Sequence, residues 1–365
     1  MSERALSAVV LAAGEGTRMR STRPKPLHLL CGRAMLLYVL DSLADCNIGR
    51  VVVVVGHGAE RVSKKLQSEA PDVLLDFVEQ HVQRGTGDAA SVGLTGLPDQ
   101  FDHADVDDDV LVLPGDQPLL RASTIAELVA THRAADAACT VLTARLPNPQ
   151  GLGRVVRGKD DRVARIVEQG DATEEEQEID EINTSIYCFR RSLLAPALRR
   201  LSPENAQGEY YLTDVVGVLH DAGHRVTSMI VDDPDEALGV NDRIQLAAAE
   251  TELRLRTNDG WLRLGVTMVD PDRTYIDTTV RLGTDVTLFP GTILQGQTVV
   301  GEHVELGPDT RLVDCVVGDG AVIEQSSGRD AEVGAGAHVG PYAVLRPGSS
   351  IPAGAITGPF YAGEA

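Results

Sequence analysis

Long apolar runs, paired cysteines and positive charge are all scarce in this sequence, and each scarcity excludes a class of protein. No run of about 18 apolar residues exists, which excludes a transmembrane helix. The five cysteines are scattered and form no CxxC pair, so we expect reduced, buried thiols and neither disulfides nor a zinc site. Lys and Arg number 33 against 54 Asp and Glu, and the net charge of −21 argues against a nucleic-acid backbone or an anionic membrane as partner.

The chain is nevertheless apolar enough to fold. Its 365 residues suggest two domains or one large domain with an appendage, and hydrophobic residues make up 43%, enough for a buried core. The first residues run directly into an apolar strand without the layout of a signal peptide, which predicts a cytoplasmic protein. A protein this acidic that binds a polyphosphate must place its few cations carefully, and we expect it to recruit a divalent metal.

Short apolar runs alternate with amphipathic stretches from about residue 7 to residue 240. Buried strands are expected at residues 8–11, 51–55, 110–113 and 139–142, and helices at 34–44, 59–68 and 124–135. Alternation of β-branched strands with helices is typical of an α/β doubly wound domain around a mostly parallel sheet. Residues 242–256 have high helix propensity, which indicates a connecting helix.

A different period begins after about residue 278. An aliphatic residue recurs every six positions from Leu282 to Leu312, then the spacing slips near Val317, breaks, and resumes from Val333 to Ile351. The density of Gly and Pro excludes helices here, and a period of six is typical of the hexapeptide parallel β-helix. About twelve hexads, three to a coil, predict a short left-handed β-helix of roughly four coils.

A loop of small residues follows the first strand, with the string Leu11-Ala12-Ala13-Gly14. Small residues after a buried strand allow backbone N–H groups to approach a phosphate or a base closely. The spacing fits neither the Rossmann GxGxxG nor the Walker A motif. Arg18 and Lys25 add positive charge where the chain has little. The loop alone also fits a glycine-rich turn with two solvated cations.

Longer strings are more specific than this loop. The loop fits the pattern LxxGxGxRxxxxxPKxL, and further strings follow at residues 80–87, 115–119, 151–154, 166–168, 181–184, 205–214 and 239–243. Together they resemble the sugar nucleotidyltransferases, and more closely the bifunctional N-acetylglucosamine-1-phosphate uridyltransferase/glucosamine-1-phosphate acetyltransferase family. The resemblance extends over nearly the whole chain, to about Gly358, and agreement in so many ordered strings is not expected by chance.

The resemblance implies three parts: a nucleotidyltransferase domain at residues 1–241, a connecting helix at 242–263 and a truncated left-handed β-helix at 264–365. It implies transfer of a uridylyl group from UTP to N-acetylglucosamine 1-phosphate, with Mg²⁺ as cofactor. The attacking phosphate oxygen is already anionic near neutral pH, so no general base is required. Catalysis then depends on holding two anions in line and neutralising the charge at phosphorus.

The resemblance also assigns roles to individual residues. Arg18 and Lys25 are the implied catalytic cations, and Asp116 with Asn241 would hold the metal through hard oxygen ligands. The nucleotide would contact Leu11, Ala12, Ala13, Gly14, Lys25, Gln80, Gly85 and Thr86. The amino sugar would contact Gly153, Glu168, Asn183 and Asn241. Without the resemblance, Asp116 also fits a turn residue and Asn241 a helix N-cap.

Three positions depart from the resembled family: Asp88 stands where His is usual, Pro114 where an aromatic or small residue is usual, and Leu152 where Tyr is usual. None is a principal ligand, so they bear on fine sugar specificity and not on the reaction. The acidic run at residues 105–109 indicates a solvated surface loop and not a metal site.

The C-terminal segment departs more strongly. The resembled enzymes continue the β-helix with a Lys, a general-base His and acetyl-CoA contacts, whereas here the string at residues 345–348 is present and no His follows His338. We therefore expect no acetyltransferase activity. Family β-helices pack flat faces together, which predicts a homotrimer weakened by the shorter helix.

Three functions fit these residues. The first is an enzyme that makes UDP-N-acetylglucosamine for cell-wall precursors. The second is a relative that activates another sugar with UTP or dTTP, because Gln80 does not separate uracil from thymine. The third is a non-catalytic paralogue that uses the nucleotide pocket for regulation. The intact set of Arg18, Lys25, Asp116 and Asn241 argues against the third, because a pocket freed from catalysis need not keep both metal ligands.

Overall fold

The computed structural model describes residues 4–70, 73–98, 107–158 and 161–363. By internal contacts the chain forms two compact units, Met1–His28 with Ala34–Gln245 and Leu29–Arg33 with Leu246–Ala365. The short segment Leu29–Arg33 therefore belongs to the second unit, and the domain bounds inferred from the sequence stay a prediction. Within the described ranges, no helix combines the length and the apolar character needed to cross a membrane.

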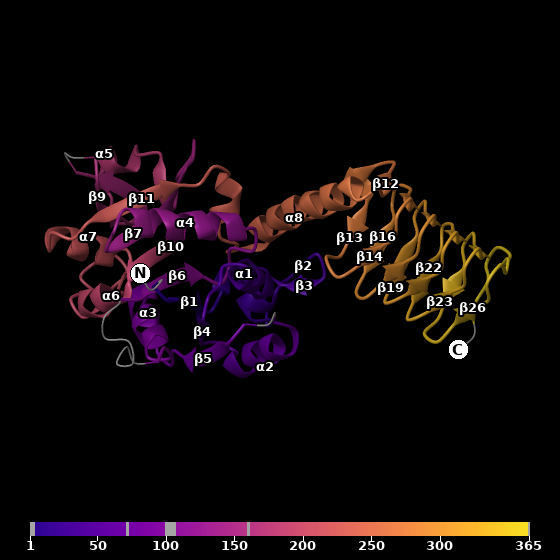
Figure 1. Cartoon of the computed structure of the whole chain (residues 1–365), viewed down its shortest axis with the longest axis horizontal. Helices are drawn as coiled ribbons and strands as arrows, with labels where there is room; N and C mark the ends of the chain where they lie inside the picture. Colours follow the sequence, from indigo (N-terminus) through magenta and orange to yellow (C-terminus); the bar gives the residue numbers. More distant parts are fainter. Residues whose placement is uncertain (1–3, 71–72, 99–106, 159–160, 364–365) are drawn as a thin grey trace. The chain divides into compact units, whose positions relative to one another are not determined.

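The first unit is built on a nine-stranded sheet whose main path runs β11-β7-β10-β6-β1-β4-β5, with β8 and β9 added at β10 (Figure 1). Its strands are β1 (Leu6–Ala12), β4 (Arg50–Val55), β5 (Leu75–Glu79), β6 (Asp109–Pro114), β7 (Cys139–Arg145), β8 (Arg154–Arg157), β9 (Val163–Val167), β10 (Glu181–Arg190) and β11 (Val226–Ile230). β1 pairs in parallel with β4 and β6, β4 with β5, and β7 with β11, whereas β10 runs antiparallel to β6 and β7. The mostly parallel sheet expected from the sequence is confirmed, with β10 as an antiparallel insertion.

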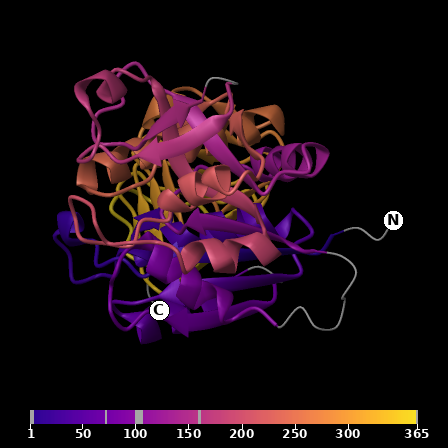
Figure 2. The same cartoon turned by 90° about the vertical axis from the view of Figure 1, so that its left-hand side faces the viewer.

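Helices cover both faces of this sheet because successive strand residues point to opposite sides. The helices are α1 (Met35–Ala44), α2 (Ala59–Glu69), α3 (Thr86–Leu94), α4 (Ala122–Ala134), α5 (Glu174–Gln177), α6 (Arg191–Leu198) and α7 (Asp214–Asp221). Val10 belongs to the core that includes α1, α2 and α4, whereas its neighbour Val9 belongs to the core that includes α3, α6 and α7. Figure 2 shows helices on both sides of the strands. Both valines are fully buried, and each contributes roughly 1.5–3 kcal/mol of burial free energy.

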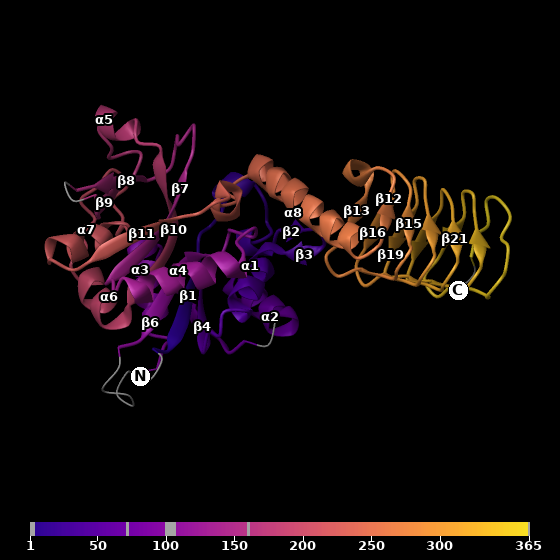
Figure 3. The ribbon, with the colours of Figure 1, turned by 45° about the horizontal axis from the view of Figure 1, so that its top comes forward.

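The second unit is a parallel β-helix that follows the long helix α8 (Arg243–Arg263). Three five-stranded sheets run β12-β15-β18-β21-β24, β13-β16-β19-β22-β25 and β14-β17-β20-β23-β26, and Figure 3 shows the strands stacked. The strands are β12 (Thr267–Met268), β13 (Tyr275–Ile276), β14 (Arg281–Leu282), β15 (Thr287–Leu288), β16 (Ile293–Gln295), β17 (Val299–Val300), β18 (Glu305–Leu306), β19 (Arg311–Val313), β20 (Val316–Val317), β21 (Val322–Ile323), β22 (Ser327–Arg329), β23 (Glu332–Val333), β24 (His338–Val339), β25 (Val344–Leu345) and β26 (Ser350–Ile351). The hexapeptide β-helix expected from the sequence is confirmed.

Two details of the β-helix differ from the expectation. Three sheets of five strands make five coils where roughly four were expected, because the hexads were counted from Leu282, in the last strand of the first coil, and the 3₁₀ helix Pro271–Arg273 interrupts the spacing before it. The break in the hexads falls at β22, where Gly328 takes the position that other strands give to an aliphatic residue. A Cβ there would lie 3.0 Å from Leu312 Cδ2, so neighbouring side chains already fill the space. The ladder therefore continues through the break.

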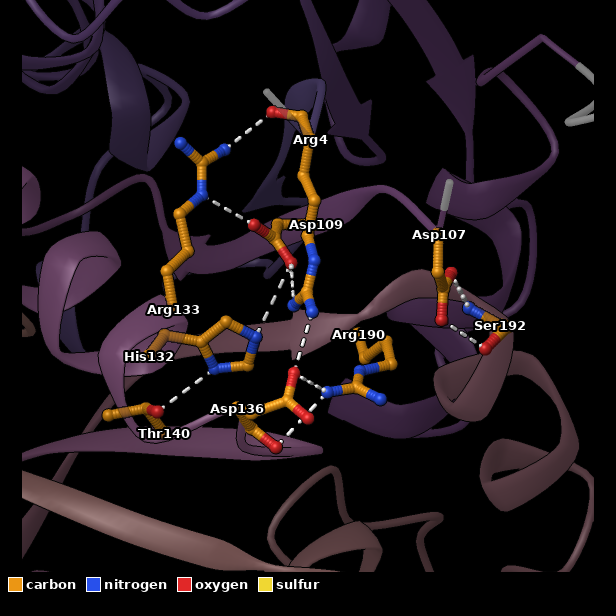
Figure 4. Close-up of polar contacts among 9 residues, drawn as sticks. All are labelled: Arg4, Asp107, Asp109, His132, Arg133, Asp136, Thr140, Arg190 and Ser192. Atoms are coloured by element: carbon orange, nitrogen blue, oxygen red, sulfur yellow. Dashed lines mark hydrogen bonds and ion pairs between the residues drawn. The ribbon is translucent and has the colours of Figure 1, made fainter. Parts of the chain in front are cut away.

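The expected solvated acidic loop at residues 105–109 is wrong for Asp109. This residue begins β6, and its side chain is fully buried. Its carboxylate accepts a 2.7 Å hydrogen bond from Arg133 Nε and lies 3.5 Å from His132 Nε2 (Figure 4). Asp107 is half-buried, and Asp105 lies outside the described residues. Part of the acidic run thus anchors a central strand, which its charge pattern alone did not indicate.

Candidate active site

A cavity of about 460 Å³ lies within the first unit, at the carboxyl ends of its central strands. β1 ends at Ala12 and β6 ends at Pro114, and both residues line the cavity. From β1 the strand order proceeds to β4 and β5 on one side, while β6 lies on the other side. Open α/β sheets bind ligands at such a switch point, outside the carboxyl ends of the strands. The topology alone therefore marks this cavity as the candidate site.

The cavity brings together most of the residues that the sequence predicts for the site. The predicted residues that line it are Leu11, Ala12, Ala13, Gly14, Lys25, Gln80, Gly85, Thr86, Asp116, Glu168, Asn183 and Asn241. Two predicted residues do not line it. Arg18 is exposed in the 3₁₀ helix Thr17–Met19, and Gly153 is buried where a Cβ would lie 3.4 Å from a carboxylate oxygen of Glu168. Their roles stay predictions.

A cation lies between two oxygen-bearing side chains in this cavity. Lys25 Nζ donates a 2.8 Å hydrogen bond to Asn241 Oδ1 and forms an ion pair with Asp116. The backbone N–H of Val240 donates to the Asp116 carbonyl at 2.8 Å, which holds the two segments together. The Lys25 and Asp116 side chains are 14% and 21% exposed, so solvent screens their charges only weakly. Asp116 and Asn241 therefore converge on one position for positive charge.

The loop after β1 approaches Lys25 very closely. Gly16 adopts φ 64°, and a Cβ there would lie 2.7 Å from Lys25 Cβ. Glycine alone satisfies both the left-handed backbone and the short approach. This contact gives a physical reason for glycine in the first motif and for its spacing from Lys25.

A second glycine-rich turn borders the cavity between β5 and α3. Gln80 follows β5 and is only 6% exposed. Gly85 adopts φ 110°, and a Cβ there would lie 2.6 Å from the Tyr210 carbonyl oxygen, so a larger residue does not fit. Thr86 Oγ1 accepts a 3.0 Å hydrogen bond from the backbone N–H of Leu212. Two strings that are distant in the sequence, 80–87 and 205–214, therefore form one wall.

A β-bulge places Asn183 in the cavity wall. The register of β10 against β7 shifts between Asn183 and Ile186, and Ser185 adopts φ 64°. Asn183 Oδ1 accepts a 3.1 Å hydrogen bond from the Ser185 backbone N–H, which fixes the side chain. Bulges re-aim side chains beside active sites, and this one lies within the string 181–184 that resembles the family.

Glu168 follows β9 and contributes a carboxylate to the same cavity. Its Oε1 accepts a 3.2 Å hydrogen bond from Thr213 Oγ1. Burial raises the pKa of Glu168, and the negative charges of Asp214 and Asp171 raise it further, although the bond from Thr213 opposes them. A carboxylate in this environment gains from a ligand that donates hydrogen bonds, such as a sugar hydroxyl.

Sequence reasoning missed two glutamines that support the site. Gln117 Nε2 donates to the carbonyls of Thr184 at 2.6 Å and Ala237 at 2.8 Å, and Gln83 Nε2 donates to the Ala13 carbonyl at 2.6 Å. Both line the cavity. Both also lie in strings that resemble the family, but no spacing indicates which way such a side chain points.

Across the described ranges, no group of three or more His, Cys, Asp and Glu is placed to hold a metal ion. An ion at Asp116 and Asn241 would therefore take one carboxylate and one amide oxygen from the protein. Mg²⁺ is usually bound by one or two carboxylates together with water and substrate phosphates. The pair fits an ion that arrives with a polyphosphate.

Comparison with known proteins agrees with this geometry. Residues 8–217 match the family of the MobA-like NTP transferase domain. The chain is 44% identical to the bifunctional protein GlmU of Brevibacillus brevis over 355 residues, which cover 97% of this chain and 75% of the relative. It is 46% identical to the same protein of Mycobacterium tuberculosis over 357 residues, 97% of this chain and 71% of the relative. The chain belongs to the GlmU family. Family membership and the NTP transferase domain identify it as a sugar-1-phosphate nucleotidyltransferase.

Proposed function

We propose that the chain transfers the uridylyl group of UTP to N-acetylglucosamine 1-phosphate and releases pyrophosphate, in the supply of cell-wall precursors. One observation carries the proposal: Lys25 lies between Asp116 and Asn241 in a cavity that Gln80 and Glu168 also line. A positive charge, two metal-type ligands, an amide for a base and a carboxylate for a sugar are the groups that this reaction requires. The similarity to GlmU proteins supports the same choice of substrates.

The bond changes place few demands on the protein. A phosphate oxygen of the sugar 1-phosphate forms a bond to the α-phosphorus of UTP. The bond from that phosphorus to the oxygen bridging to the β-phosphate breaks, and its electron pair leaves with pyrophosphate. No proton is transferred, so the site needs positive charge and alignment and no general base. Among the described residues that line the cavity, Lys25 is the one Lys or Arg, and it supplies this charge.

The residues present fit Mg²⁺, because the oxygens of Asp116 and Asn241 already face one cation, the Lys25 ammonium. Asp116 and Asn241 would hold the ion, which when bound supplies positive charge to the phosphate oxygens. The Lys25 ammonium contacts Asp116 Oδ2 and Asn241 Oδ1, and its flexible four-carbon side chain would let it reach the phosphates with the ion bound. Arg18, which does not line the cavity, is assigned to the triphosphate by the family resemblance alone.

The amino sugar is assigned to the residues around Glu168. The Glu168 carboxylate accepts hydrogen bonds from ring hydroxyls, and the Asn183 amide, held by the β10 bulge, contacts the acetamido group. Gly153 immediately precedes β8, at a position where a Cβ would lie 3.4 Å from a Glu168 carboxylate oxygen. A glycine at this position keeps room for the sugar beside the carboxylate.

Pyrophosphate release from a panel of substrates tests the proposal. Purified protein is incubated with Mg²⁺, with UTP, dTTP, CTP or ATP, and with the 1-phosphates of N-acetylglucosamine, N-acetylgalactosamine and glucose. We expect the highest kcat/KM for UTP with N-acetylglucosamine 1-phosphate. A clear preference for another sugar or for dTTP would assign the chain to a different sugar activation. No release with any pair would contradict the proposal.

A further inference from the structure

Asp88, one of the three positions that depart from the resembled family, contacts the residue assigned to the base. Gln80 Nε2 donates a 2.7 Å hydrogen bond to Asp88 Oδ2 and makes a longer contact of 3.4 Å with the Gly85 carbonyl oxygen. Gln80 and Gly85 line the cavity, whereas Asp88 does not. Asp88 therefore acts on the Gln80 side chain from outside the cavity lining.

These contacts determine which end of the Gln80 amide faces the ligand. A side-chain amide has two N–H donors on nitrogen and an acceptor on oxygen. A carboxylate and a backbone carbonyl both accept, so the nitrogen must face them. Rotating the amide by half a turn would set Oε1 against two acceptors and leave Nε2 without them. Gln80 is 6% exposed, so little water is present to compensate for such a loss.

The start of α3 supplies both acceptors that face Gln80 Nε2. Asp88 is in the first turn of this helix, and Gly85, whose carbonyl makes the longer contact, is its N-cap.

We propose that Asp88 is a positioning residue that makes the site selective for bases with an N3–H group, uracil or thymine, over cytosine. With Nε2 held by Asp88, the Gln80 amide offers Oε1 to the ligand. Uracil N3–H donates to this oxygen, whereas N3 of cytosine is an acceptor and meets acceptor against acceptor. A site built to accept from one N–H rejects an analogue that lacks it. The inference rests on the proposed function, in which Gln80 faces the base.

The test compares UTP and CTP binding by calorimetry in four proteins: wild type, Asp88→Ala, Asp88→Asn and Glu60→Ala. Asp88→Ala should lower the UTP-to-CTP affinity ratio by about tenfold or more, because the 3.4 Å contact with the Gly85 carbonyl then orients the amide without the carboxylate. Asp88→Asn keeps a side-chain oxygen that accepts from Nε2, so it should retain most of the ratio. Glu60 is an exposed carboxylate in the first turn of α2, and its removal controls for loss of a helix-terminal charge. It should leave the ratio unchanged.

A double substitution separates this role from a structural one. Because Asp88 acts through Gln80, adding Asp88→Ala to Gln80→Ala should not lower the ratio further. A lower UTP-to-CTP affinity ratio in the double variant than in Gln80→Ala would overturn the inference. A folded Asp88→Ala protein with the wild-type ratio would also overturn it. If Asp88→Ala does not fold, loss of the ratio in Asp88→Asn would overturn it and retention would support it. A wild type that binds UTP no better than ATP overturns the proposed function itself, which the other outcomes leave intact.

Discussion

Removal of the Asp116 carboxylate is the most direct test of the site. Asp116→Ala takes away the charged partner of Lys25 and leaves Asn241 as a neutral ligand. Metal charge stabilises a phosphoryl-transfer transition state by several kcal/mol, and each 1.4 kcal/mol corresponds to about a tenfold change in rate. We therefore expect kcat to fall roughly thousandfold, with the fold intact. Asn241→Ala removes a neutral oxygen, so its effect should be smaller.

Pyrophosphate release at saturating substrates, repeated over a titration of Mg²⁺, measures this effect. The requirement for Mg²⁺ should shift to higher concentration in both variants. Asp242→Ala is the matched control, because Asp242 Oδ1 accepts 2.9 Å hydrogen bonds from the backbone N–H groups of Ile244 and Gln245 and does not line the cavity. Its loss should cost about 1 kcal/mol of stability as a helix cap. Near-normal kcat in Asp116→Ala, or an equal loss in Asp242→Ala, would refute the metal-site reasoning.

Further predictions concern the base, the fold and the assembly. Gln80→Ala should weaken UTP binding by about 1–3 kcal/mol, and an equal loss for ATP in the same calorimetric titration would contradict the assignment to uracil. Burial would raise the pKa of Asp109, but His132 and Arg133 outweigh it and hold that pKa below its usual value. The stabilisation of the folded state by the ionised Asp109 carboxylate is therefore complete above about pH 4, and it is lost as the pH falls through the lowered pKa. Asp109→Asn should lower the free energy of unfolding at pH 7 by about 3–5 kcal/mol and flatten its acid dependence in urea titrations, and unchanged stability would show that the ion pairs contribute nothing. Sedimentation over a concentration series should show a homotrimer, which a strict monomer would exclude. Glucosamine 1-phosphate should not release thiol from acetyl-CoA, and steady release would contradict the expected loss of acetyl transfer.

The sequence predicts the fold well where periodicity is strong. The strand expected at residues 51–55 lies within β4, because five consecutive valines suit a strand buried on both faces. The hexads place Leu288 and Leu294 in successive strands with fully buried side chains. Prediction fails where a single side chain departs from the pattern. Gly328 carries no aliphatic side chain, so the hexad count stops at a strand whose partners are still in register.

The site shows the same division between backbone and side chains. Glycine positions such as Gly16 and Gly85 follow from local strings, because a left-handed backbone and a close approach require glycine. Side-chain direction does not follow from any string. Asp109 is an acidic residue in an acidic run, and burial beside Arg133 is visible only after α4 packs on β6. Asp88 likewise differs from a surface carboxylate only through its contact with Gln80.

The stacking of the β-helix gives the two units different modes of unfolding. A coil inside the stack hydrogen-bonds with the coil before it and the coil after it, as β18 does with β15 and β21. The stability of such a stack is approximately the sum of the stability of each coil and of the interactions between adjacent coils. Opening of one coil therefore removes the interactions with its adjacent coils alone, so unfolding can proceed coil by coil. In the sheet of the first unit, Val9 and Val10 tie both helical layers to one strand, so the loss of that strand removes both cores together.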